Sequence, residues 1–239
     1  MMRMFKKAGV AVLGLSAVLL SGNALAAWQT LVGTNVTYVY DDTLMGLYGQ
    51  PILSGDSLVF TPTNFKAQST NGQGIVQTSS TINVQVYTNA NYNFSAFTLT
   101  ELGDYSLIGS DAQVAVGGQI RAFDLTNPPP PAANQLTDPI AVTAPLTVTT
   151  SLANYQTTNW QANAAIAVPT NWSNGVNLTI ENILLASTTQ LGSAAFVEKK
   201  FVGNSVVLTP VPEAETYAMM LAGLGLVGFM ARRRNLASA

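Results

Sequence analysis

"TINVQVYT", residues 81–88, is the stretch whose side-chain pattern decides the fold class. Ile82, Val84 and Val86 alternate with polar residues, so in an extended chain they would all lie on one face. A period of two with one apolar face is typical of a β-strand that lies between a core and water. The segment therefore predicts a strand with one buried face.

Similar short strand patterns recur along the chain, and no amphipathic helix of useful length interrupts them. They cover residues 35–40, 56–61, 96–102, 112–118, 118–125, 140–152, 163–168, 176–185, 194–202 and 204–209. Glycine-containing turn signals lie between them, among them Asn71–Gly72, Gly103–Asp104 and Gly117–Gly118. The sequence thus predicts an all-β fold, a single jelly-roll-like β-sandwich over residues 27–210.

A proline-rich segment, "NPPPPAAN" at residues 127–134, divides these strands into two groups. It cannot be a central strand, because proline donates no ladder hydrogen bond. It is either a surface loop within one domain or a stiff linker between two. We favour the loop, because residues 135–211 are few for an independent sandwich.

The residue types that are missing exclude several kinds of chemistry. The chain of 239 residues has no histidine and no cysteine, and only 9% of its residues are charged. It therefore lacks the Ser-His-Asp and Cys-His nucleophile systems, ordinary zinc sites and disulfides. Carboxylate chemistry and oxygen-ligated metals such as calcium remain.

Residues 1–26 have the pattern of a secretory signal peptide. A basic start is followed by the apolar run at residues 8–20 and by the small residues Ala24 and Ala26. Cleavage by signal peptidase after export through the Sec machinery would make Ala27 the first residue. The alternative is an uncleaved N-terminal anchor, for which the apolar run is short.

The body that remains is acidic. Residues 27–211 hold ten acidic and four basic side chains, a net charge of about −6. Such a body lacks the positive charge that binds nucleic acid, and we do not expect it to bind anionic membranes.

The C-terminal stretch 211–235 permits three interpretations. Its glycines have the spacing GxGxxG, but the chain ends too soon after them to complete a βαβ unit, so a dinucleotide site is rejected. The apolar run 217–231 and the following Arg232, Arg233 and Arg234 also fit a short transmembrane helix with its arginines in the cytoplasm.

The third interpretation is a sorting signal. The C-terminal stretch resembles the PEP-CTERM signal of Gram-negative bacteria. It has the motif Val211–Pro212–Glu213, then an apolar helix and then the arginine cluster. Ala214 follows Pro212–Glu213 at the third position of the Pro-Glu motif, where the signal has proline. The resemblance implies recognition by an exosortase at the inner membrane and cleavage near the Pro-Glu motif. It also implies release or attachment at the cell surface, in bacteria that make exopolysaccharide and biofilms.

Three kinds of site are candidates within the body. Calcium could bind at turn-flanking carboxylates, namely Asp41, Asp42 and Asp104. Carbohydrate could stack on Trp160 and Trp172, which lie among Asn and Gln residues, although both could equally be core aromatics. A glycoside hydrolase needs a carboxylate pair, and no feature of the sequence nominates one.

We therefore expect a non-enzymatic exported protein of the cell surface or extracellular matrix, sorted by an exosortase. A carbohydrate-binding module of the matrix is the alternative, and a hydrolase is the least favoured. The expected partners are the export and sorting machinery and, for the module, exopolysaccharide.

Overall fold

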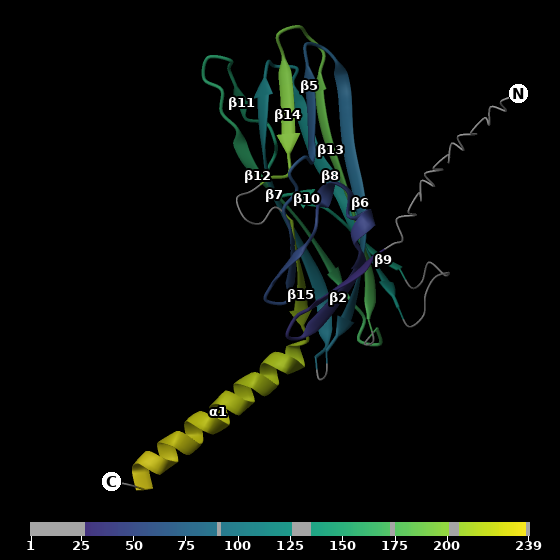
Figure 1. Ribbon diagram of the computed structural model, residues 1–239. Coiled ribbons are helices and arrows are strands. Elements are labelled where there is room, and N and C mark those ends of the chain that lie inside the picture. Colours follow the sequence, from purple (N-terminus) through teal and green to yellow (C-terminus); the bar gives the residue numbers. More distant parts are fainter. Residues whose placement is uncertain (1–26, 90–91, 126–134, 173–174, 201–205, 238–239) are drawn as a thin grey trace, which may run out of the picture.

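The computed structural model describes residues 27–89, 92–125, 135–172, 175–200 and 206–237 (Figure 1). The predicted signal peptide, with Ala24 and Ala26, lies outside these residues, as does the proline-rich segment 127–134. Ala27 is described and exposed, and it precedes the first strand.

The body consists of two sheets, as the alternating patterns predicted. One sheet has six strands in the order β1 (Trp28–Val32), β2 (Val36–Asp41), β6 (Gly74–Thr88), β13 (Val176–Thr188), β8 (Gln113–Asp124) and β9 (Gln135–Pro139). The other runs β10 (Ala141–Val142), β12 (Thr158–Ala167), β7 (Phe94–Ile108), β15 (Val206–Pro212), β4 (Ser57–Phe60) and β3 (Ile52–Ser54). Both sheets combine strands from before and after residues 126–134.

The long strand β7 organises the second sheet. It pairs with β12 along one edge, while its other edge is shared by β15 and then by β14 (Ala194–Glu198). β5 (Lys66–Thr70) pairs with β14, and β11 (Thr149–Thr150) runs parallel to β7; every other ladder is antiparallel. Two short 3-10 helices, η1 (Asp42–Leu44) and η2 (Gly46–Tyr48), follow β2.

The core lies between the sheets. Ile82, Val84 and Val86 are fully buried, so the predicted inner face of β6 is confirmed. Tyr48 of η2 packs edge-on against Phe60 and Phe65, with ring centroids 5.6 and 5.5 Å apart. Apolar burial of this extent is the main favourable term in folding.

Two of the predicted turns are wrong. Gly103–Asp104 lies inside β7 and Gly117–Gly118 inside β8. Each sheet needs a glycine there because a neighbour approaches closely: a Cβ on Gly103 would lie 2.0 Å from Glu198 O, and one on Gly118 2.0 Å from Glu181 O. Asn71–Gly72 is a turn, with φ of 54° and 77°.

The predicted strand at residues 140–152 is also wrong in extent. Only Ala141–Val142 and Thr149–Thr150 are strand within it, and they pair with different partners. Conversely, β1, β3, β5 and β9 were not predicted.

Gly103 gives a direct test of this packing. Gly103→Ala would push a methyl group to within 2.5 Å of the Trp160 ring as well as against Glu198 O. Overpacking of this kind costs about 1–3 kcal/mol or more, so thermal unfolding should begin several degrees lower. Gly117→Ala is the matched control, because a Cβ there meets nothing within 4 Å. Equal melting temperatures for the two variants would contradict the close packing of Trp160 and Glu198 against Gly103.

Candidate functional site

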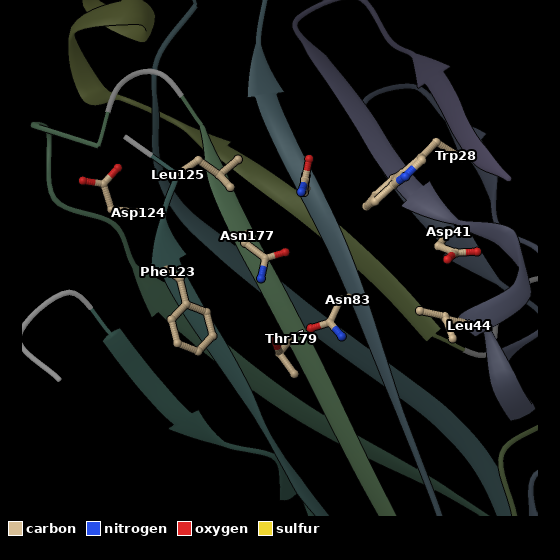
Figure 2. Close-up of a pocket in the computed structure, with 10 residues that line it drawn as sticks. Trp28, Asp41, Leu44, Asn83, Phe123, Asp124, Leu125, Asn177 and Thr179 are labelled. Atoms are coloured by element: carbon tan, nitrogen blue, oxygen red, sulfur yellow. Dashed lines mark hydrogen bonds between the residues drawn. The ribbon is translucent and has the colours of Figure 1, made fainter. Parts of the chain in front are cut away.

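A groove of about 540 Å³ crosses the outer face of the six-stranded sheet (Figure 2). Its lining comes from β1, β2, η1, β6, β8 and β13 and comprises Trp28, Asp41, Leu44, Asn83, Gln85, Phe123, Asp124, Leu125, Asn177 and Thr179. In Figure 2, Trp28, Asp41 and Leu44 stand on the right and Phe123, Asp124 and Leu125 on the left. Asn83, Asn177 and Thr179 lie between these two groups. We call this site the outer groove.

The floor of the outer groove is made of amides and a hydroxyl because of strand register. Asn177 of β13 lies opposite Gln85 of β6, and Thr179 lies opposite Asn83. Thr179 Oγ1 donates to Asn83 Oδ1 at 2.6 Å. Amide groups that have both donors and acceptors, fixed on paired strands, can match the hydroxyls of a sugar.

Apolar side chains stand on both sides of the outer groove. Trp28 is 61% exposed and Leu44 59%, on the side of the groove formed by β1 and η1. Asp41 accepts from the backbone N–H of Thr43 at 2.9 Å and from its hydroxyl at 2.6 Å, which caps η1 and so fixes the turn that carries Leu44. An exposed indole beside a polar floor is the combination that stacks against a sugar ring.

The two tryptophans that the sequence nominated lie elsewhere. Trp160 and Trp172 are each only 4% exposed, so neither presents a face to a ligand and the expectation of a platform there is corrected. Trp160 covers Gly103 across the β7–β12 ladder, and its Nε1–H donates to the carbonyl oxygens of Asp104 and Glu198, both at 3.2 Å. Both residues are core aromatics, the alternative that the sequence left open.

The structure does not bring the three proposed calcium ligands together. Asp41 ends β2 of the first sheet and Asp42 begins η1, whereas Asp104 lies within β7 of the second sheet. Within the described ranges, no group of three or more Asp, Glu, His or Cys side chains could hold a metal ion. Burial raises the pKa of Asp104, and the charge of Glu198 raises it further, while Lys200 opposes both.

A buried polar cluster, which the sequence pattern does not predict, lies between the sheets. Glu101 of β7 forms an ion pair with Lys199, which follows β14, and accepts from Asn182 Nδ2 of β13 at 2.6 Å. Asn182 Nδ2 also donates to the Tyr48 hydroxyl. All four side chains are at most 1% exposed. We call them the Glu101 cluster.

Burial within the Glu101 cluster shifts the pKa of two of its members, Lys199 and Tyr48. Burial lowers the pKa of Lys199, although the charge and hydrogen bond of Glu101 act in the opposite direction. Burial raises the pKa of Tyr48 well above its usual value, and the charge of Glu101 adds to that effect. The Lys199 ammonium group lies 5.1 Å from the ring centroid of Trp160 and 5.6 Å from that of Phe65.

The C-terminal segment leaves the sandwich directly from β15. Ser95 Oγ donates to Pro212 O at 3.1 Å, and Glu213 N to Asn93 O at 3.1 Å, so the predicted Val-Pro-Glu motif is held at the end of the sheet. The helix α1 (Ala214–Ala237) then projects away from the body (Figure 1). Its large apolar side chains are 53–75% exposed where described, namely Met219, Met220, Leu221, Leu224, Leu226, Val227, Phe229 and Met230.

The predicted membrane span is not confirmed. Of the helices in the described residues, none is both long enough and apolar enough to traverse a membrane. Arg232, Arg233 and Arg234 lie within α1, at its C-terminal end.

Comparison with known proteins identifies the C-terminal segment. The family model of the PEP-CTERM protein-sorting motif matches residues 210–234. The chain therefore carries this motif at its C-terminus, as the resemblance indicated, and the motif implies an exported protein that an exosortase processes at a membrane. Comparisons with curated proteins and with solved structures give no match.

Proposed function

We propose that the chain is a non-enzymatic surface or matrix protein of a Gram-negative bacterium, and that its sandwich binds exopolysaccharide in the outer groove. The observation that carries the binding role is the exposed indole of Trp28 beside the amide floor of Asn83, Gln85 and Asn177. Stacking and amide hydrogen bonds suit a neutral sugar chain, and the absence of His and Cys from the sequence favours a binding role over catalysis.

The segments at the two ends of the chain determine how the sandwich is exported and sorted. Signal peptidase removes residues 1–26 after Sec export, and α1 then holds the precursor at the inner membrane through its exposed apolar side chains. An exosortase cuts near Pro212–Glu213 and passes the body to the cell surface or matrix. A cut on the C-terminal side of Pro212 keeps β15 whole, because Pro212 is the last residue that pairs with β7.

Trp28→Ala tests the outer groove. Loss of one stacked indole should weaken binding of the host's purified exopolysaccharide about tenfold or more, measured by affinity electrophoresis of the exported protein. Tyr155→Ala is the control, because this aromatic side chain is 55% exposed and is not part of the groove lining. Unchanged binding by Trp28→Ala, or an equal loss in both variants, would argue against the groove. Depolymerisation of the polysaccharide would contradict the non-enzymatic role.

Glu213→Ala tests the sorting step. The variant should accumulate with its tail in the membrane fraction of the host, since the motif that the exosortase recognises is altered. Glu215→Ala, a change two residues further along and outside the Val-Pro-Glu motif, should be released like the wild type. Immunoblots of membrane and medium fractions give the distribution. Normal release of Glu213→Ala would refute the assigned role of this residue.

A further inference from the structure

The Glu101 cluster places an amine, a carboxyl group and a carboxamide in contact inside an apolar core. One oxygen of Glu101 accepts from Lys199 Nζ, and the other accepts from Asn182 Nδ2. Glu101 and Asn182 are fully buried and Lys199 is 1% exposed, so bulk water does not reach them. A single carboxyl group thus bridges a potential nucleophile and a potential acyl donor.

The surroundings of Lys199 favour the reactive form of its amine. The rings of Trp160 and Phe65 lie against Nζ, and burial lowers the pKa of this side chain. A lysine amine becomes a nucleophile when desolvation removes its proton. Glu101 Oε2, in contact with Nζ, can receive that proton.

The amide of Asn182 is held with its carbonyl oxygen unused. Its Nδ2 donates to Glu101 and to Tyr48, whereas Oδ1 is buried and has no hydrogen-bond partner. A buried unpaired acceptor is costly and calls for an explanation. Nδ2 of Asn182 contacts the carboxyl group of Glu101, which can protonate it, as loss of this nitrogen as ammonia requires.

We propose that Lys199 and Asn182 become joined by an intramolecular isopeptide bond, with Glu101 as the proton carrier. Nζ attacks Cγ of Asn182, the new C–N bond forms, and the Cγ–Nδ2 bond breaks. Of the three protons that the ammonium group begins with, Nζ keeps one and gives two to Glu101. Glu101 passes one of them to Nδ2, which leaves as ammonia, and the other stays on the carboxyl group. No external reactant is needed.

The bond would join the two sheets covalently. Asn182 belongs to β13 at the centre of the six-stranded sheet, and Lys199 follows β14 of the other. A chain without cysteine cannot form a disulfide, so this linkage would supply the cross-link that an exported domain otherwise obtains by oxidation. This inference is independent of the proposed function.

Peptide mapping of the full chain tests the bond. Cleavage after Glu181, Glu198 and Glu213 in the denatured protein separates Asn182 from Lys199, in peptides 182–198 and 199–213. We expect the two peptides to remain joined. The mass of the joined species should lie about 17 Da, the mass of ammonia, below the sum of the masses of the two separate peptides. Two separate peptides of unaltered mass would overturn the proposal.

Three variants distinguish the bond from other losses of ammonia, such as succinimide formation at Asn-Gly pairs. Lys199→Arg should restore the full mass, and Lys200→Arg, which alters the exposed neighbouring lysine, should retain the linked peptides. Asn182→Asp should give the same linked peptides with loss of about 18 Da, because water leaves in place of ammonia. A mass loss that persists in Lys199→Arg would contradict the proposal even if that variant folds poorly.

Discussion

The Glu101 cluster is the constraint on which the two-sheet arrangement depends. A charged group withdrawn from water is tolerated only when it has a partner, and Glu101 supplies that partner to Lys199 while it also accepts a hydrogen bond from Asn182 Nδ2. Removing one member of such a buried pair typically costs about 3–5 kcal/mol, a large part of the stability of a domain. The two sheets must therefore pack in the one arrangement that brings these side chains together. In that arrangement the Trp160 ring lies over Gly103 and covers the amine of Lys199.

The same strand that contributes to the cluster also builds the outer groove. In β13 the side chain of Asn182 points into the core, whereas Asn177 and Thr179, at odd positions, lie on the opposite face. A shift of one residue in the pairing of β13 would exchange these faces and lose both features. Stability and the proposed binding surface thus depend on a single register, which the hydrogen bond from Asn182 of β13 to Glu101 helps to fix.

The alternation at residues 81–88 was enough to predict the class of fold, because the period of side chains along a strand is local. The functions of individual residues were less accessible. Gly103 resembles a turn residue until Trp160 is known to occupy the space above it. Trp160 itself resembles a sugar platform by its polar neighbours in sequence, yet it is buried, whereas Trp28 in a strand with no clear alternation is the exposed indole. Glu101 could not be paired with Lys199 without the fold, since they are distant in sequence.

The sorting motif joins the sandwich without a linker, since β15 ends at Pro212 and α1 begins at Ala214. We propose that processing at this junction turns a membrane-held precursor into a free β-sandwich, and this is the central claim about the chain. The intact mass of the protein isolated from its own host tests that claim most directly. A chain that begins at Ala27 and ends near Pro212–Glu213 is the predicted result. A chain that still contains residues 217–234 would make α1 a permanent anchor and contradict the claim.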